Sequence, residues 1–523
     1  MLRRQRRRWC RLGCFLAFVV VAAPQPSSAQ EPAPAERETA PGQTPTVPGQ
    51  APTVPGEPTP PAVILPAPLG PTPTDTVPVI PDTQLLPNPT VPSAPQRVLP
   101  AAAFRGPASA RLQFAPTITV SEEYTDNFNL TARDKRSNYR TTVAPGLDVT
   151  INSAFVKGLI SYKFAPAYDT ITDDVSQFHS LLGQIVWDAT PYWRLSLADT
   201  FTQSDQPVEA DRLGLRQQRQ KFTSNTASIA SDYLLGLVAT RQSYQLSVFS
   251  DDQGGETTSH TAAISATIPL YQTNSLSVGY EYLNSTTSGE NGALGTSGDV
   301  DVTGHRFTAG VTRRINHLQT VGIIGSYALR STSGDGITDA DFQLWNVGFV
   351  SEYSSGRLKI NSLLGVSGLT GDSGQSLGPD FSTRTNITYR FAHAVVSIGA
   401  DQGFSETFTD GQNFGVIETK GVNASLAYPF TPLFSGTILG SYRKNKTTGF
   451  GPTSVTAVSN QESEVWTGTL LLSWQPRKWL GVDVSYVYTR HTGADLGQTV
   501  RTGATNDQNY SENRVRLGVN LSF

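Results

Sequence analysis

Apolar and polar residues alternate along the chain from about residue 111 to its last residue. In the final segment every second residue is apolar: Val515, Leu517, Val519, Leu521 and Phe523. Side chains of a strand point alternately to its two faces, so a period of two predicts strands with one apolar and one polar face. The same register runs through earlier segments, which include Val143, Leu147, Val149, Ile151; Val156, Ile160, Tyr162, Phe164; Leu276, Val278, Tyr280, Tyr282; and Leu480, Val482, Val484, Tyr486, Tyr488.

Two kinds of connection alternate between these segments. Short turns are expected near 152–154, 189–192, 235–238, 269–273, 314–317, 353–357, 391–393, 429–432 and 474–478, and long polar loops near 125–137, 169–176, 204–220, 251–258, 285–303, 331–340, 371–380, 407–414, 447–461 and 492–507. Outer-membrane barrels have short periplasmic turns and long outer loops, whereas strands of soluble sheets are usually only about 5 or 6 residues long. Residues 111–523 are therefore predicted to form an all-β, transmembrane, antiparallel up-and-down β-barrel of about 20 strands, within a range of roughly 18 to 22.

The first residues are typical of an export signal. Arginines at positions 3, 4, 6, 7, 8 and 11 precede an apolar stretch, and the small residues Ser27, Ser28 and Ala29 follow it. This order predicts a signal peptide of residues 1–29, cleaved after Ala29. The apolar stretch is shorter than the roughly 20 residues of a spanning helix, and no longer one follows, which excludes a helical membrane protein.

Residues 30–110 contain more than half of the chain's 35 prolines. Proline fixes φ and lacks an N–H donor, so neither a helix nor a central strand is expected there. The segment is predicted to be disordered, partly in polyproline II conformation, and to lie in the periplasm. Two roles stay open: a solvated linker, and a tether that meets the cell wall or a groove on a partner.

Charge and cysteine content exclude several classes of function. The formal net charge is −3 and becomes more negative without the arginine-rich leader, so no nucleic-acid partner is expected. Both cysteines, Cys10 and Cys14, lie in that leader. The exported chain would then have no disulfide, no thiolate metal site and no cysteine nucleophile.

No residue pattern indicates catalysis, a cofactor or a metal. The histidines lack the spacing of metal ligands: His179, His260, His305, His317, His393 and His491. Asp335, Asp339 and Asp341 cluster in one loop, but not with the spacing of a calcium loop. We expect no cofactor, no metal and no enzyme activity; an unrecognised hydrolase with serine and histidine near the outer rim remains the alternative.

The alternation also predicts which charged side chains face the lumen, because lipid penalises a central Arg or Lys by about 2–4 kcal/mol. These lumen-lining candidates are Asp148, Lys157, Lys163, Arg194, Glu281, Asp483, Arg514 and Arg516. They are expected either to form a structural ladder across strands or to select solutes or glycans. Asp199 falls on the apolar register, which predicts a bulge or a position at the outer rim.

Two sequence features resemble known membrane proteins. The terminal aromatic residue, Phe523, resembles the signal that barrel-assembly machinery reads in the last strand of outer-membrane barrels. Ile118-Thr-Val-Ser-Glu-Glu-Tyr-Thr-Asp-Asn127 and Val143-Ala-Pro-Gly-Leu-Asp-Val149 resemble the outer-membrane β-barrel porin family associated with exopolysaccharide and PEP-CTERM loci. This resemblance spans about residues 111–523 and implies fold and location more than activity.

The resulting hypothesis is a channel in the bacterial outer membrane, acting by passive diffusion or in secretion-associated export, with polysaccharide as a candidate solute. Its expected partners are outer-membrane lipid, the assembly machinery, and polysaccharide or cell wall. A structural or adhesive surface anchor with an occluded lumen and glycan- or protein-binding loops is the alternative. A receptor driven from the inner membrane would need a folded plug, which the proline-rich segment does not resemble. Solute, oligomeric state and openness of the lumen stay undetermined.

Overall fold

The computed structural model describes residues 112–205, 221–252, 255–288, 299–334, 340–371, 376–407, 415–450, 462–493 and 509–523, all within one compact unit. Every regular element in these ranges is a strand. The strands are β1 (Leu112–Thr125), β2 (Asn138–Asn152), β3 (Val156–Asp169), β4 (Asp174–Thr190), β5 (Trp193–Ser204), β6 (Phe222–Leu235), β7 (Val238–Asp251), β8 (Glu256–Pro269), β9 (Asn274–Ser288), β10 (Val300–Arg314), β11 (Gln319–Gly334), β12 (Ala340–Ser354), β13 (Leu358–Gly371), β14 (Ser376–Arg390), β15 (Val395–Glu406), β16 (Val416–Thr431), β17 (Phe434–Thr447), β18 (Glu462–Arg477), β19 (Leu480–Gly493) and β20 (Tyr510–Ser522).

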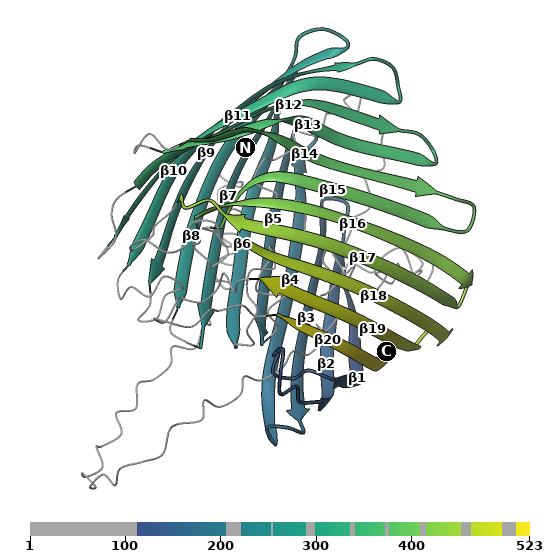
Figure 1. Ribbon diagram of the computed structural model, residues 1–523. Coiled ribbons are helices and arrows are strands. Elements are labelled where there is room, and N and C mark those ends of the chain that lie inside the picture. The colour runs from purple at the N-terminus through teal and green to yellow at the C-terminus, as the bar shows by residue number, and fades with distance from the viewer. Residues whose placement is uncertain are drawn as a thin grey trace, which may run out of the picture. The chain divides into compact units, whose positions relative to one another are not determined.

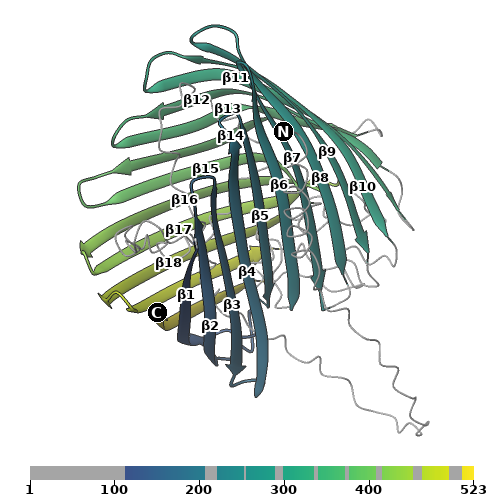
Figure 2. The ribbon, with the colours of Figure 1, turned by 180° about the vertical axis from the view of Figure 1, so that it is seen from behind.

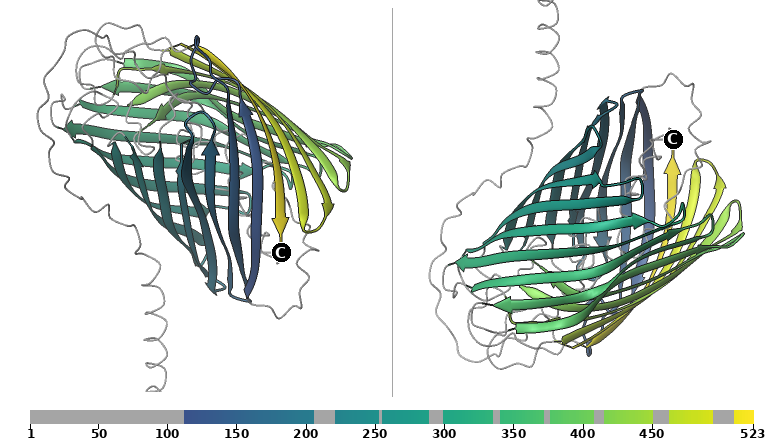
Figure 3. Two further views of the ribbon diagram at one scale, coloured as in Figure 1. Left: turned by 90° about the horizontal axis from the view of Figure 1, so that it is seen from below. Right: turned by 90° about the horizontal axis from the view of Figure 1, so that it is seen from above.

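The strands form a closed barrel. Each strand pairs antiparallel with its neighbours in sequence, and β1 also pairs with β20, with Thr117–Thr125 opposite Arg514–Ser522. Figures 1 and 2 show the strands following one another around the wall, and Figure 3 shows the last strand beside the first. The predicted fold class and the 20 strands are confirmed.

The barrel has two unlike rims. At one rim, which we call the short-turn rim, tight turns such as residues 236–237, 432–433 and 478–479 join the strands. At the opposite, long-loop rim, the connections are longer and many of their residues lie outside the described ranges. This segregation follows the connection lengths that the sequence predicts.

Large apolar side chains point away from the barrel. On β2, Val143 and Leu147 are exposed, while Thr142 and Ala144, on either side of Val143, are buried. Exposed apolar residues continue around the wall, for example Phe307, Val311, Ile323, Val347, Phe349, Leu364, Val366, Phe381 and Ile387. A closed sheet with apolar side chains outside and satisfied backbone groups is suited to lipid. Among the described residues no helix has the length and apolar content to cross a membrane.

The structure shows neither the bulge nor the outer-rim position expected for Asp199. Pairing of β5 with β4 and β6 is regular from Arg194 to Gln203, so no bulge lies at Asp199. It is also not at a rim, because outward Leu197 and Phe201 flank it along the strand. The carboxylate therefore faces outward within the apolar band, where Asn225 Nδ2 donates a hydrogen bond to its Oδ1 over 3.1 Å.

Several predictions concern residues that the structure does not describe. They are the signal peptide of residues 1–29, the proline-rich segment to residue 110, and the loop residues Asp335 and Asp339. For these segments the sequence-based expectations stand as predictions.

Candidate functional site: the barrel interior

The structure places all eight charged lumen candidates at inward positions of their strands. Six lie on neighbouring strands around the β1–β20 seam: Asp148 on β2, Lys157 and Lys163 on β3, Asp483 on β19, and Arg514 and Arg516 on β20. The other two, Arg194 and Glu281, lie on β5 and β9. Most of these charged side chains therefore lie on one part of the inner wall, and the eight do not converge on a single point.

Local partners hold most of these charges. Asp148 accepts a hydrogen bond from Ser161 at 2.5 Å, and Asp483 accepts bonds from Ser473 at 2.6 Å and Asn520 at 2.5 Å. Bonds of this kind join adjacent strands across the inner wall.

The remaining candidates with partners are arginines and Glu281. Arg194 pairs with Asp188 at 2.7 Å, and Arg516 donates to Ser121 at 3.1 Å. Arg514 lies 3.7 Å from Glu512, and Glu281 lies 3.8 Å from Arg306.

Near the long-loop rim, Arg140 of β2 is the centre of a buried charge network. Its guanidinium donates to both carboxylate oxygens of Asp169, at 2.7 and 2.5 Å, and to Asp205 at 3.0 and 3.3 Å. Asn138 also donates to Asp169 at 2.7 Å, and the Phe178 ring lies 5.3 Å from the guanidinium carbon. Two-pronged pairing of this kind is the strong form of charge-assisted hydrogen bond, so the network ties β2, β3 and β4 to the end of β5.

Elsewhere along the long-loop rim, the end of β15 separates from β14, while β16 stays paired with β17 as far as Ile417–Thr447. Pairing of β14 with β15 stops at Thr383–Gln402, whereas β15 and β16 remain paired up to Glu406–Val416. At Gly403 the backbone has φ +155°, a conformation that L side chains rarely adopt. Beyond this residue, β14 is paired with β13 alone, and Ser376–Phe381 are exposed.

The end of the β15–β16 hairpin that has separated from β14 packs against inward side chains of the facing strands. Val416 and Ile417 are adjacent in an extended strand, so their side chains point to opposite faces, and both are fully buried. Glu406 at the tip of β15 pairs with Arg330 of β11 at 2.8 Å and with Arg306 of β10. Since three strands separate β15 from β11 in the wall, this contact crosses the interior.

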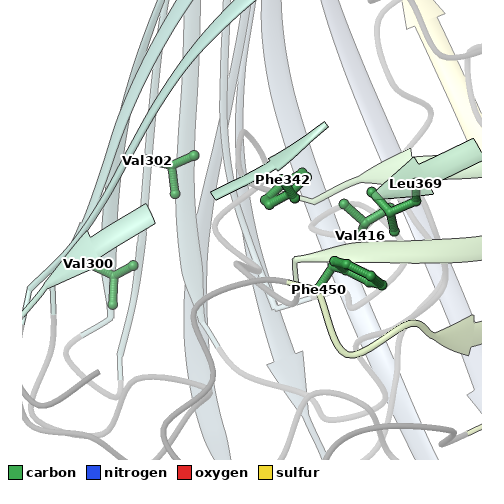
Figure 4. Close-up of a cluster of buried hydrophobic side chains, with 6 residues drawn as sticks. All are labelled: Val300, Val302, Phe342, Leu369, Val416 and Phe450. Atoms are coloured by element: carbon green, nitrogen blue, oxygen red, sulfur yellow. The ribbon is translucent and has the colours of Figure 1, made fainter. Parts of the chain in front are cut away.

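Apolar side chains secure the same inward end. Figure 4 shows the cluster, which consists of Val300, Val302, Phe342, Leu369, Val416 and Phe450. Phe450 follows β17, and its carbonyl accepts a hydrogen bond from the Val416 amide at 2.8 Å. Leu344 and Phe404 pack against the cluster. The interior near the long-loop rim is therefore narrowed by a hairpin held through both ionic and apolar contacts.

The wall from β5 to β9 has a different chemistry. Its inward side chains are largely hydroxyls: Ser196, Thr200, Thr202, Ser204, Ser224, Thr226, Ser228, Ser243, Ser247, Thr257, Ser259, Thr261, Ser265, Thr267, Ser275, Ser277, Ser285 and Thr287. Some bond across strands, as Ser259 with Ser285 at 2.7 Å and Thr257 with Thr287 at 3.0 Å. Charged side chains on the same wall are paired, as Arg194 is with Asp188 and Arg241 with Asp232. Hydroxyls both donate and accept hydrogen bonds without charge, so the hydroxyl-bearing part of this wall suits neutral polar groups.

The histidines do not gather into a site. His179, His260 and His305 lie on the outward face, where tyrosine hydroxyls contact their Nδ1 atoms at 2.7–2.9 Å. His491 is buried and stacks on Tyr510. Within the described ranges, no group of three or more His, Cys, Asp or Glu side chains could hold a metal ion.

Sequence reasoning missed the buried networks. Arg306 and Arg330 follow the same alternation as the predicted residues, since Phe307 and Leu329 beside them are exposed, so the parity rule could have found them. Glu406 could not be found that way. It has the same parity as outward Ile398, but the backbone change at Gly403 lies between them.

No protein-family model matches the sequence, and no curated protein matches it. Solved structures with a similar arrangement include the FrpB iron transporter from Neisseria meningitidis, at 12% identity over 78% of this chain and 81% of that chain, with a TM-score of 0.45. A ferric enterobactin receptor from Pseudomonas aeruginosa has 10% identity over 79% and 81%, with a TM-score of 0.45. The siderophore receptor PirA from Acinetobacter baumannii has 9% identity over 78% and 80%, with a TM-score of 0.42.

Proposed function

We propose that this chain is an outer-membrane barrel that lets neutral, hydroxyl-rich solutes cross, by passive diffusion or as the outer channel of an export system. The hydroxyl wall of β5 to β9 is the observation that carries the proposal, because each serine or threonine can exchange its hydrogen bonds for those of a sugar hydroxyl. Glycans, polysaccharide included, are the solute class with the matching chemistry. The proposal involves no catalysed reaction.

The location rests on the outward face and the connections. Apolar side chains cover the outside, aromatic residues such as Tyr192, Tyr271 and Trp479 are exposed at the short-turn rim, and the loops are longer at the other rim. Aromatic rings of this kind favour a membrane–water interface. The proposal puts the short-turn rim in the periplasm, after cleavage of a signal peptide at Ala29 and insertion by assembly machinery that reads Phe523.

The likeness to porins associated with exopolysaccharide and PEP-CTERM loci supports polysaccharide as cargo, on sequence motifs alone. The proline-rich segment of residues 30–110 would then extend into the periplasm and meet the cell wall or an export partner.

One structural observation favours the alternative, a surface anchor with an occluded lumen. The inward end of the β15–β16 hairpin is fully buried at Val416 and Ile417, which is the packing of a fixed obstruction. In that case binding would belong to the outer loops, and the hydroxyl wall would only hydrate the interior.

Swelling of proteoliposomes distinguishes the two functions. Vesicles that contain the full-length protein, purified from membranes, are diluted into isotonic solutions of neutral sugars of increasing size and of charged sugars of matched size. We expect entry of neutral sugars to be faster than that of charged ones, with a size limit. Vesicles that stay impermeable to every sugar, while the barrel is folded, would contradict the transport function and favour the anchor.

A further inference from the structure

Cationic side chains on the outer surface of the barrel gather in one place. In the half of the described strands next to the long-loop rim, the lysines and arginines that alternation places outward are Lys420, Lys444, Lys446 and Arg490, on β16, β17 and β19. These strands follow one another in the wall with β18 between β17 and β19 (Figure 1). Arg313, an exposed outward cation on β10, lies instead beside the short-turn rim. The outer wall is therefore cationic over one short sector of the long-loop rim.

The charges begin where the apolar surface of β18 ends. From the long-loop rim to the short-turn rim, the outward residues of this strand are Glu462, Glu464, Trp466, Gly468, Leu470, Leu472 and Trp474. Indole rings favour the membrane–water interface, and both Trp466 and Trp474 are half exposed. With a rise of about 3.3 Å per residue, the strand between them is roughly 26 Å long, comparable with the apolar band of about 25 Å in membrane barrels. Trp466 therefore marks the boundary at which lipid head groups would begin.

Two cations flank Ser511 at this boundary. Arg490 of β19 is directly opposite Trp466 on one side and Ser511 of β20 on the other. From the connection between β1 and β2, the Lys135 ammonium donates to the carbonyl of Ser511 at 3.0 Å and to its hydroxyl at 2.9 Å. The Cβ atoms of directly opposite residues are about 4.5–5.5 Å apart. One anion beside Ser511 can therefore be reached by both the guanidinium and the ammonium.

These two cations lack acidic partners. Among the described residues, neither Arg490 nor Lys135 forms an ion pair with a carboxylate. Asp126, further along the outward face, accepts hydrogen bonds from Asn513 instead. Two of the neighbouring lysines do have carboxylate partners, in the pairs Lys420–Glu418 at 2.9 Å, Lys444–Glu462 at 2.7 Å and Lys444–Glu464 at 3.3 Å. An anion that binds both free cations would offset their mutual repulsion.

We propose that Arg490, Lys135 and Ser511 form a binding site for the phosphate head group of a lipid in the leaflet beside the long-loop rim. A guanidinium pairs with phosphate through two parallel hydrogen bonds, and an ammonium binds it as a point charge. The Ser511 hydroxyl accepts from Lys135 and keeps its own O–H as a donor. A lipid is favoured over a soluble anion because the exposed side chains of Trp466 and Leu470 adjoin the site, and acyl chains can pack against them. The site goes beyond the transport function and rests only on the membrane location proposed with it.

Native mass spectrometry of the full-length protein in a neutral detergent tests this site. The probes are phosphatidic acid and the diacylglycerol with the same acyl chains, which differ only in the phosphate. Arg490→Gln and Lys135→Gln each remove one cation of the site, and Arg313→Gln removes the outward cation at the other rim. We expect the dissociation constant of phosphatidic acid to rise about tenfold or more in the first two variants, because a charge-assisted hydrogen bond is lost, and to change by less than about twofold in Arg313→Gln. Diacylglycerol should bind equally to all the variants.

Three results would overturn the proposal. One is the same affinity for phosphatidic acid in Arg490→Gln, Lys135→Gln and Arg313→Gln. Another is equal binding of phosphatidic acid and diacylglycerol to the wild type, which would show that the phosphate is not recognised. The third is displacement of phosphatidic acid by an equal concentration of inorganic phosphate, which would indicate a site for soluble anions. Because the site lies outside the lumen, single-channel conductance should be the same in all these variants, so failure of the site and failure of the transport function are distinguishable.

Discussion

Glu406 of β15 and Arg330 of β11 lie 2.8 Å apart, although β12, β13 and β14 separate their strands in the barrel wall. The contact exists because the tip of the β15–β16 hairpin bends inward beyond Gly403. Side chains of both residues are largely shielded from solvent, with exposed fractions of 1% for Arg330 and 14% for Glu406. An ion pair in this setting holds the hairpin in place inside the barrel.

Removing the acidic partner should release the hairpin end. In Glu406→Gln, Arg330 and Arg306 lose their common carboxylate, and breaking a buried ion pair costs about 3–5 kcal/mol. We expect faster hydrogen exchange over residues 403–407 and 415–418 and a higher single-channel conductance. Glu418→Gln is the matched control, since it removes an exposed pair with Lys420 on the same hairpin. Equal exchange in both variants would show that the ion pair does not hold the hairpin.

Gly403 should be the point at which the hairpin bends. Gly403→Ala forces a residue with a Cβ into a backbone region that costs of order 1–3 kcal/mol, although the added Cβ would make only an ordinary contact, 3.7 Å, with Ser382 Cβ. The variant should therefore lose stability and favour a hairpin that continues along β14. Gly440→Ala, on β17 with nothing within 4 Å of the added Cβ, should be neutral. Thermal unfolding in detergent and conductance check both, and equal midpoints would refute the hinge.

The Arg140 network should matter far more than a half-exposed ion pair. Arg140→Gln leaves Asp169 and Asp205 buried without their cation, so we expect destabilisation of about 3–5 kcal/mol. Arg194→Gln removes a pair whose side chains are 40% and 37% exposed, and should cost less than about 1 kcal/mol. The temperature at which the folded band disappears on heat-modifiability gels measures both. Similar temperatures for the two variants would contradict this ranking.

Each hydroxyl on the inner wall of β5 to β9 should make its own separate contribution to the free energy of sugar binding. Thr200→Val keeps the shape of an exposed inward side chain but removes its hydroxyl, a loss of about 0.5–1.5 kcal/mol for one hydrogen bond. Block of the ionic current by sugar should weaken by about two- to tenfold, with the sugar-free current unchanged. Thr223→Val, outward on β6, should leave the block unaltered. Identical block in both variants would exclude a role for the wall.

The fold could be predicted from the sequence because its determinants are local. Alternation over long segments determines which side chains face lipid, so the inward positions of residues such as Asp148 and Arg516 could be predicted. The alternation of short and long connections distinguishes the two rims, so the number of strands could be predicted as well. The inward hairpin could not be predicted. It depends on a single backbone conformation at Gly403 and on contacts of Glu406 with Arg330 and Arg306, which lie 76 and 100 positions away along the chain. Alternation along one strand does not encode such contacts.

Asp199 shows the limit of the same rule in another way. Its parity gave the correct face, but the cost of a carboxylate in lipid led to the expectation of a bulge or a rim position. In the structure, strand pairing is regular at Asp199 and the residue lies within the apolar band. A hydrogen bond from Asn225 on the next strand offsets part of the free-energy cost of placing the carboxylate there. A pattern along one strand cannot reveal a partner on another.

Single-channel recording of the full-length protein in planar bilayers, with graded neutral sugars, tests the central claim most directly. The transport function predicts stable conductance steps that small sugars reduce and that sugars above a size limit leave unchanged, with larger steps for Glu406→Gln. A folded, heat-modifiable barrel that gives no steps, in the wild type and in Glu406→Gln alike, would contradict it.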